Sequence, residues 1–385
     1  MQQTSVKNIL HLPRWYPNTS DPQNGVFVLK QIKTLMPWYN NMVLFVKSEK
    51  EKKHFSVNRK KTEHYDELQI NFAKSKYSVV NLYRYFKEFR KGMNILVKEN
   101  GTPALIHIHI LLRNGLLGWY YAWKFKIPFI VSEHWSGYIT GKYEKKNFLY
   151  RKLMMMILHR AQKILVVSQS LKTALTTLGI DEEKLEIVPN VVEKSQVTTE
   201  TGKKSGEKII ILSVADLVDD IKKISGIIEA LAEIKNLNNI EYHIIGDGPD
   251  RMMLEKLSEQ KNLLNKVVFF DGRKPNSEVL KIINNCSFLV INSITETFSV
   301  VTAEALMAGK PVVVTRCGGP EYFVNGTNGI LIKPGNKKEL KAALEKMIEE
   351  HKNYDPQRLK KSVEQKFSAN IIGIRLKKIY DKILV

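Results

Sequence analysis

The amino-acid sequence predicts an α/β protein in which two doubly wound, mostly parallel sheets follow one another along the chain. The chain has 385 residues, which exceeds the ~100–200 residues of one ordinary domain. Short apolar runs of strand length alternate with segments of helix length, first in one half of the chain and then in the other. A polar stretch without periodicity separates the two series. Because strands that alternate with helices form parallel sheets, each half predicts one doubly wound domain.

The first predicted domain covers residues 1–195. Its short apolar runs are rich in branched aliphatic residues, which is typical of buried strands. These runs cover residues 8–12, 42–46, 104–110, 129–131 and 164–167. Most of the segments between them are long enough to form the helices that connect parallel strands.

A linker is expected over residues 196–207, because residues 198–206 are polar, contain glycine and lack periodicity. The second domain is expected over residues 208–365. Its predicted strands cover residues 209–214, 242–245, 267–270, 288–291 and 311–314. Ligands of doubly wound sheets bind beyond the carboxyl ends of the strands, so the loops at those ends are where chemistry is expected.

The composition points to a reducing compartment and to no membrane span. Cys286 and Cys317 are the only cysteines and both lie in apolar stretches, which argues against a disulfide scaffold. The first residues do not have the pattern of a secretory signal, and no apolar run approaches the ~18 residues of a transmembrane helix. We therefore expect a cytoplasmic protein that can associate peripherally with the inner membrane face.

Positive charge is concentrated in the first half of the chain. The formal net charge is +21, and residues 1–195 hold 31 Lys and Arg against 15 Asp and Glu. A strongly basic half should face an acidic partner. Nucleic acid, anionic lipid headgroups and a phosphorylated acceptor all meet that description.

Two glutamates follow the predicted strand 288–291. Residues 300–308 have a helical pattern, and Thr295 or a neighbour can cap that helix. A pyrophosphate would fit the free N–H groups at its N-terminus. Glu296 lies at this end and Glu304 lies about two turns further along. At ~1.5 Å per residue, the pair should span ~12 Å on roughly the same face, which suits the ribose and the sugar of a nucleotide-sugar.

The sequence around this pair resembles the donor site of the family-4 glycosyltransferases, or glycosyl transferases group 1. The resemblance rests on Glu296, seven intervening residues and Glu304, followed by the segments 308–313 and 318–321. It implies the GT-B fold, in which two Rossmann-like domains face each other across a cleft and residues 366–385 form a C-terminal helix that crosses back to the N-terminal domain. It also implies that Glu304 holds ribose hydroxyls and that Glu296 contacts the transferred sugar.

The same resemblance assigns further donor contacts. An Arg and a Lys of the family bind the donor diphosphate; Lys222 takes the Lys position, but Asp216 stands at the Arg position. Because a carboxylate cannot replace a cation, Lys222, Lys223 and the helix N-terminus would have to neutralise the phosphates. The other predicted donor-binding residues in this half are Arg273, Thr297, Phe298 and Ser299.

Two residues of the first half complete the predicted site. Gly25 lies in a segment that resembles the family's opening glycine loop, where a missing side chain lets the backbone approach a ligand. His134 follows the strand 129–131 and matches a family histidine that touches the sugar. His107 and His109 share a face of another strand, but no further zinc ligands are evident, and no metal site is predicted.

The resemblance implies a retaining hexosyltransferase, with Glu296, His134 and Lys222 as catalytic residues. It would move a hexose from a nucleotide-diphosphate sugar to a saccharide or lipid-linked saccharide in cell-surface polysaccharide synthesis, without a cofactor or an obligatory metal. A sugar-nucleotide epimerase on the same fold and a non-enzymatic basic protein that binds nucleic acid are the alternatives. The sequence contains no recognisable nucleic-acid module, so no nucleic-acid partner is expected.

The sequence predicts a basic amphipathic helix over residues 77–98, which is relevant to where the protein meets its acceptor. Its apolar face is expected to contain Leu82, Phe86, Phe89, Met93 and Leu96. Such a helix can lie at an anionic membrane interface or can be an ordinary core helix with a solvated back. The first possibility would bring the protein to a lipid-linked acceptor.

Overall fold

The computed structural model describes residues 6–49, 55–193 and 208–384. The chain forms two compact units. The first comprises residues 1–167, 171–191 and 369–385, and the second comprises residues 168–170 and 192–368. Val192 and Glu193 thus belong to the second unit, whereas the sequence placed them in the first. The predicted linker 196–207 lies outside the described residues.

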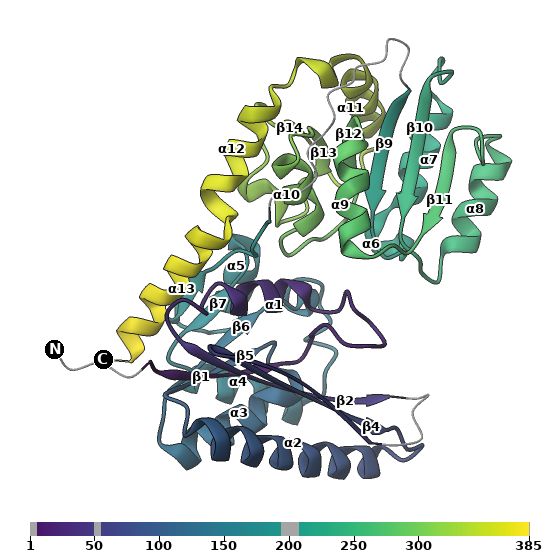
Figure 1. The fold of residues 1–385 in the computed structure, drawn as a ribbon. Coiled ribbons are helices and arrows are strands. Elements are labelled where there is room, and N and C mark those ends of the chain that lie inside the picture. Colours follow the sequence, from purple (N-terminus) through teal and green to yellow (C-terminus); the bar gives the residue numbers. More distant parts are fainter. Residues whose placement is uncertain (1–5, 50–54, 194–207, 385) are drawn as a thin grey trace. The chain divides into compact units, whose positions relative to one another are not determined.

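The first unit is built on an eight-stranded sheet (Figure 1). Its strands are β1 (Asn8–Pro13), β2 (Asn40–Glu49), β3 (Ser56–Thr62), β4 (Tyr65–Ala73), β5 (Leu105–His109), β6 (Phe129–Glu133), β7 (Ile164–Val166) and β8 (Leu185–Ile187). The spatial order is β3-β4-β2-β1-β5-β6-β7-β8, and only the β3–β4 pair is antiparallel. Chain order therefore reverses between β1 and β5, which is the point where doubly wound sheets bind ligands.

Helices cover both faces of this sheet (Figure 1). They are α1 (Val26–Lys33), α2 (Ser78–Asn100), α3 (Leu112–Phe125), α4 (Phe148–Arg160), α5 (Gln169–Thr177) and α13 (Ala369–Ile383). Helices α2 and α3 pack on one face, with α4 beside α3, while α1 and α13 pack together on the other face. Helix α13 buries Ile372, Leu376 and Tyr380 against residues of the central strands.

The second unit is built on a six-stranded parallel sheet of order β11-β10-β9-β12-β13-β14. Its strands are β9 (Ile209–Val214), β10 (Ile240–Ile245), β11 (Val268–Gly272), β12 (Phe288–Ile291), β13 (Val312–Thr315) and β14 (Gly329–Ile332). Its helices are α6 (Asp219–Lys222), α7 (Ile224–Ala232), α8 (Arg251–Gln260), α9 (Asn276–Asn285), α10 (Val300–Met307), α11 (Lys337–Glu350) and α12 (Pro356–Phe367). This order is that of a Rossmann sheet, with its switch point between β9 and β12.

The structure contains four strands that the sequence pattern did not indicate, β3, β4, β8 and β14. Strand β3 is polar and exposed along nearly its whole length, so it has no apolar signal. Strand β4 contains Asp66, Glu67 and Gln69, yet all three side chains are buried. Strands β8 and β14 have only three and four residues. Strands β3, β4 and β8 lack the apolar run by which buried strands were recognised, whereas β14 contains a run of three apolar residues that was overlooked.

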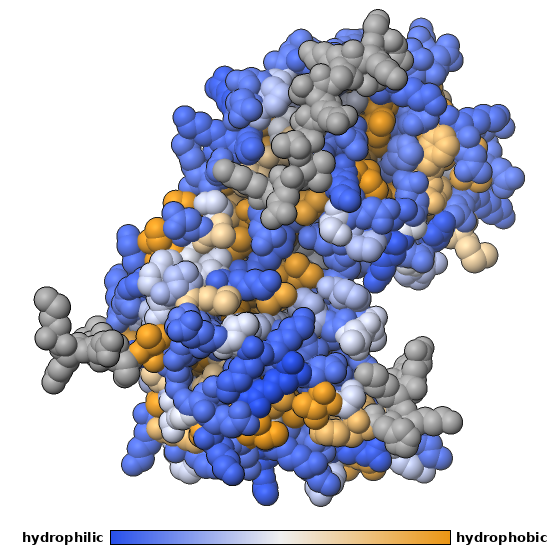
Figure 2. All heavy atoms as spheres, in the orientation of Figure 1, coloured by the Kyte–Doolittle hydropathy of each residue, from blue (hydrophilic) through white to orange (hydrophobic). Residues whose placement is uncertain are grey.

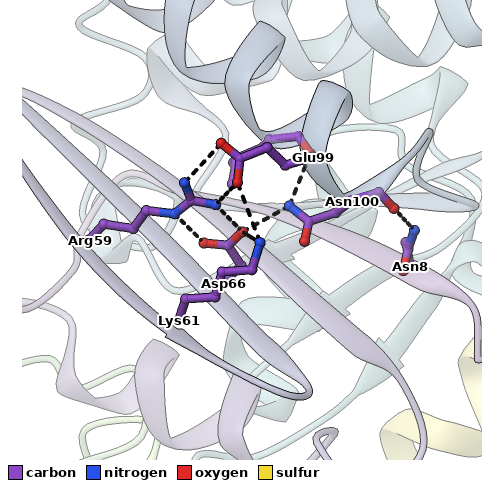
Figure 3. Close-up of polar contacts among 7 residues, drawn as sticks. Asn8, Arg59, Lys61, Asp66, Glu99 and Asn100 are labelled. Atoms are coloured by element: carbon purple, nitrogen blue, oxygen red, sulfur yellow. Dashed lines mark hydrogen bonds and ion pairs between the residues drawn. The ribbon is translucent and has the colours of Figure 1, made fainter.

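A polar network explains how β3 and β4 are held (Figure 3). The Arg59 guanidinium donates to both carboxylate oxygens of Asp66, at 2.8 and 2.6 Å, and to both of Glu99 at the end of α2, at 3.0 and 2.7 Å. The Asn100 amide donates to Asp66 at 2.8 Å. Burial alone would raise the pKa of Asp66, but the hydrogen bonds from Arg59 and Asn100 hold that pKa below its usual value. The network fastens the β3–β4 hairpin to α2.

Helix α2 forms where the sequence predicts it, but its apolar face differs. Phe89, Met93 and Leu96 are buried, whereas Leu82 is 44% exposed and Phe86 is only half-buried. Val79 and Tyr83, in the first two turns of α2, are also exposed. None of the helices in the described ranges has both the length and the apolar character needed to cross a bilayer.

Candidate active site

The carboxyl ends of β9 and β12 bring two predicted catalytic residues together. Lys222 ends the short helix α6 after β9, and Glu296 lies in the loop after β12. The Lys222 Nζ donates to Glu296 Oε1 at 2.6 Å, and the Ser293 hydroxyl donates to the same oxygen at 2.7 Å. The two side chains are 23% and 15% exposed. The ion pair therefore lies at the switch point of this sheet, where a ligand of a Rossmann unit is expected.

Backbone contacts hold these two loops against each other. The Ile294 N–H donates to the Ile221 carbonyl at 2.8 Å. The Asn292 amide donates at 2.8 Å to the carbonyl of Lys223, which has a left-handed φ of 49°. Lys223 therefore sits directly at the junction between the loops. Asn292 and Ser293, which sequence reasoning passed over, position the two charged residues, and their place just after a buried strand is the signal that could have found them.

The structure corrects the expected geometry of the glutamate pair. Helix α10 begins at Val300, so Glu296 lies in the preceding loop and shares no helix face with Glu304. The residue at the N-cap is Ser299 rather than Thr295, and its side chain makes no capping hydrogen bond. Helical spacing thus did not apply to this pair. Glu304 is only 6% exposed.

The loop of Glu296 is held instead by the segment after β13. The Glu296 N–H donates to the Cys317 carbonyl and the Gly319 N–H donates to the Glu296 carbonyl, each at 2.9 Å. A Cβ on Gly319 would lie 2.5 Å from the Cα and N of Phe298. Only glycine permits this approach, which explains one of the motif positions on physical grounds.

The three residues before α10 differ in what they can offer a ligand. Phe298 is 1% exposed, and its ring packs against Phe323 and Phe367 at centroid distances of 5.4 and 5.1 Å. Its side chain is part of the core, so only its backbone could meet a donor. Thr297 is half-buried, and the buried Ser299 hydroxyl lies 2.7 Å from that of Thr302.

Arg273 lies beside the position at which the sequence lacks the family's arginine. Its guanidinium contacts Asp216 Oδ1 at 2.9 Å, and the two side chains are 55% and 74% exposed. Asp216 follows β9 and Arg273 follows β11, so both occupy the carboxyl edge of the sheet. A guanidinium is thus present at this edge, although a different strand supplies it.

The aspartates near this edge make structural contacts. Asp219 accepts hydrogen bonds from the N–H and hydroxyl of Ser225 at 2.9 and 2.6 Å, and Asp250 accepts one from the Asp219 N–H at 2.7 Å. These carboxylates hold the start of α6 and α7 and the loop after β10. Their contacts account for them without a ligand.

In the first unit, Gly25 has a structural reason to be glycine. Its φ is 67°, and a Cβ would lie 2.3 Å from the carbonyl carbon and oxygen of Trp15. The residue forms the N-cap of α1. Packing against residue 15 and a left-handed backbone both require glycine here, and contact with a ligand stays a prediction.

His134 follows β6 directly and is buried next to Glu133. Its ring lies 4.5 Å from that of Phe27, and burial lowers the pKa of His134 to about 3. Among the described residues, its Nε2 has no hydrogen-bond partner. The Glu133 carboxylate accepts the Leu111 N–H at 2.8 Å on one oxygen, while its other oxygen also lacks a described partner. Burial raises the pKa of Glu133 to about 7.

Three buried histidines come together at the centre of the first sheet. Their ring nitrogens lie within 4.8 Å of one another and could hold a metal. His11 joins His107 and His109, which the sequence had already paired. His11 contacts Asn41 at 3.0 Å and His109 at 3.1 Å, and His107 contacts Tyr380 at 2.5 Å and Ser132 at 2.7 Å. Burial lowers the pKa of all three, so they form a neutral hydrogen-bonded core.

Comparisons with known proteins agree with this architecture. The family model for glycosyl transferases group 1 matches residues 196–366, and the model for glycosyltransferase family 4 matches residues 54–196. An uncharacterized glycosyltransferase of Methanocaldococcus jannaschii is 28% identical over 77% of this chain and 79% of its own. The alpha-monoglucosyldiacylglycerol synthase of Acholeplasma laidlawii is 29% identical over 61% of this chain and 64% of its own.

A solved structure shares the fold of nearly the whole chain. Anabaena HepE in complex with UDP-glucose has a TM-score of 0.71 and 17% identity, over 98% of this chain and 100% of that one. The predicted GT-B fold with two Rossmann-like domains is therefore confirmed. Together with the two family matches, these observations show that the chain is a glycosyltransferase of the family-4, group 1 class.

Proposed function

We propose that this protein is a retaining hexosyltransferase that takes its sugar from a nucleotide-diphosphate donor. The observation that carries the proposal is the Lys222–Glu296 ion pair at the switch point of the second sheet. It places a cation for a phosphate and a carboxylate for sugar hydroxyls within one hydrogen bond of each other, just before the N-terminus of α10. The complex of the similarly folded Anabaena HepE with UDP-glucose supports a uridine donor.

In the transfer, the bond between the anomeric carbon and the diphosphate oxygen breaks, and its electron pair goes to the diphosphate. The acceptor oxygen forms the new bond to that carbon, and its proton passes to an oxygen of the departing diphosphate. Lys222, Lys223 and Arg273 supply positive charge for the leaving diphosphate, which is the interaction that strengthens as the bond breaks. Glu304 would accept hydrogen bonds from the ribose hydroxyls. Gly25 and the backbone of Thr297, Phe298 and Ser299 would line the donor.

The ion pair also suggests an order of events. Lys222 neutralises Glu296 through their ion pair. A diphosphate carries more charge than one carboxylate, so it competes for the Lys222 ammonium. Glu296 then becomes available to the hydroxyls of the transferred sugar. His134, neutral because burial depresses its pKa, can contact the sugar without adding positive charge near the developing oxocarbenium ion.

The proposed acceptor is a saccharide or lipid-linked saccharide of a cell-surface polysaccharide, reached from the cytoplasmic face of a membrane. The basic first half of the chain supports an acidic or membrane-borne acceptor. The related alpha-monoglucosyldiacylglycerol synthase, named for a glycolipid product, supports a lipid acceptor. No cofactor and no obligatory metal enter the proposal.

A thermal-shift screen against UDP-, GDP-, ADP- and TDP-linked sugars tests the donor, because a ligand that binds only the folded protein raises its melting temperature. The donor that binds is then incubated with acceptor extracts, and the anomeric configuration of the product is read by NMR. An inverted product would contradict retention. Conversion of the donor to another nucleotide-sugar without any acceptor would instead identify an epimerase.

A further inference from the structure

An apolar groove of about 450 Å³ lies on the outer side of the first unit, between α2 and α3. Phe86 of α2 forms one wall. Residues of α3 form the rest, and they are Leu116, Leu117, Trp119, Tyr120 and Trp123. Trp123 is 73% exposed and Tyr120 is 47% exposed. Every residue that lines this groove is apolar or aromatic, which is unusual for a water-facing surface.

A basic pocket of about 1,090 Å³ adjoins the groove, because Trp119 and Trp123 line both. Its cations come from three helices and two loops, and they are Lys124, Lys126, Arg160, Lys163 and Lys382. Glu186 is the one acidic residue that lines it. The Arg160 guanidinium lies over the Trp119 ring at 5.1 Å from its centroid, so charge and aromatic surface meet at the boundary.

Within the described part of the chain, four cations of this pocket have no carboxylate partner. Among the described residues, Lys124, Lys126, Arg160 and Lys382 form no ion pair with a carboxylate, whereas Lys377, also on α13, pairs with Asp381. Helices α3 and α4 contain no Asp or Glu at all. A pocket lined by five cations and one carboxylate, beside an apolar groove, is complementary to an anionic amphiphile.

More apolar side chains are exposed along the same helical layer. Val79 and Tyr83 on α2 are 76% and 67% exposed, and Phe148 and Leu149 on α4 are 71% and 75% exposed. Figure 2 shows apolar side chains at the surface of the unit that contains α2, lying among hydrophilic ones. These four residues lie in the first two turns of their helices, and helices between parallel strands begin at the edge where the strands end. His134 lies at that same edge. Lys124 and Arg160 lie in the last turns of α3 and α4, so the basic pocket is at the other end of this helical layer.

We propose that this two-part surface docks the protein on a bilayer that contains anionic phospholipid. The basic pocket, which includes Lys124 and Lys382, takes the phosphate of a lipid headgroup. The apolar groove, which includes Tyr120 and Trp123, lies at the level of the bilayer where amphipathic rings settle, between the headgroups and the acyl chains. The proposal rests on the membrane-borne acceptor proposed above, but it concerns a surface separate from the donor site.

Sedimentation of the full chain with vesicles tests this surface. Vesicles of phosphatidylglycerol and phosphatidylcholine are compared with vesicles of phosphatidylcholine alone, at low and high salt. We expect binding only to the anionic vesicles and its loss at high salt. Removing two cations near an anionic surface should weaken binding about thirty-fold, which is the effect expected of Lys124→Gln with Lys382→Gln. Tyr120→Ala with Trp123→Ala should weaken binding without removing its salt dependence.

Matched controls come from the second unit. Lys256→Gln with Lys266→Gln removes the same charge from exposed positions, and Met252→Ala removes an apolar side chain that is 81% exposed. Both controls should bind vesicles as the unaltered protein does. The proposal is wrong if the variant with Lys124→Gln and Lys382→Gln binds vesicles as well as the unaltered protein does. It is also wrong if the unaltered protein binds both vesicle types equally.

Two further measurements separate the possible failures. Donor-induced thermal shift should be unchanged in all these variants, so a failed vesicle experiment leaves the sugar-transfer proposal standing. An RNA oligonucleotide is included as a competing anion. If the oligonucleotide binds in a manner that depends on Lys124 and Lys382 while the vesicles do not bind, the pocket is a nucleic-acid site and the proposal is wrong.

Discussion

The Lys222 ammonium and the Glu296 carboxylate lie 2.6 Å apart, although 74 positions separate them in the chain. They meet because β9 and β12 are neighbours in the sheet. The strand that follows β9 in the chain lies on one side of this pair, and the strand that follows β12 lies on the other side. Each residue alone is an ordinary charged side chain in a loop. Their pairing, at the position where such a sheet reverses its strand order, is what makes the site specific.

Glu296→Gln should lower the rate of sugar transfer at least a hundred-fold. Gln keeps an oxygen that accepts from Lys222 and Ser293 but loses the charge that strengthens hydrogen bonds to sugar hydroxyls in the transition state. The pair is partly exposed, so the melting temperature should change little. Steady-state kinetics and thermal melts measure both effects. Glu345→Gln, which alters a surface pair with Lys341 on α11, is the matched control, and a Glu296 variant as active as this control would remove Glu296 from the mechanism.

Arg273→Gln should raise the KM for the donor about ten-fold and change kcat less. The guanidinium is more than half exposed and bound to Asp216, so its charge acts on donor binding through solvent. Asp216→Asn should act in the opposite direction, because it removes a negative charge near the diphosphate and releases Arg273. Initial rates at several donor concentrations and two salt concentrations test this. Equal KM values in the two variants would show that neither residue is near the diphosphate.

Gly319→Ala should reduce transfer far more than it reduces stability. The added Cβ would lie 2.5 Å from Phe298 backbone atoms, and the loop of Glu296 would have to move to relieve the contact. Gly326→Ala is the control, since a Cβ at Gly326 meets nothing within 4 Å. Transfer rates and melting temperatures of both variants are compared. The role given to Gly319 fails if its variant retains full activity.

The fold was largely predictable because the buried parallel strands are short apolar runs, and ten of them stand out between helical segments. Strands such as β4 could not be found, because Asp66 and Glu67 become buried only through partners that are distant in sequence. For Asp66 these are Arg59 and Asn100. Periodicity reports which face of an element is apolar and contains no information on such partners.

The candidate site was predicted as a set of residues but not as a geometry. Resemblance named Lys222 and Glu296, and the structure joins them by one hydrogen bond. The spacing argument for Glu296 and Glu304 was wrong because it extended the helix back to residue 296, whereas α10 starts at Val300. A left-handed Ser299, with φ of 64°, ends the loop there. Such a backbone reversal has no signature in hydrophobic spacing.

The pH dependence of stability should reveal the buried carboxyl group of Glu133. Burial raises the pKa of Glu133 from 4.5 to about 7 in the folded protein, so between these values the folded state binds more protons than the unfolded state. This group therefore makes the free energy of unfolding fall as pH rises. Between pH 5 and pH 8 the fall should be about 2–3 kcal/mol. Buried histidines act in the opposite sense: His11 and His134 have pKa values lowered to about 4 and about 3, so they cost stability as pH falls below 6.5.

Comparison with Glu133→Gln isolates the carboxyl group, because the histidines contribute equally to both proteins. The stability of the variant relative to the unaltered protein should increase by about 2–3 kcal/mol from pH 5 to pH 8. Denaturant unfolding at several pH values measures this difference. Glu144→Gln, at an exposed position of the same unit, should show no such trend. A constant difference between the Glu133 variant and the unaltered protein across this range would mean that Glu133 is ionised throughout, and that the group next to His134 is a fixed negative charge.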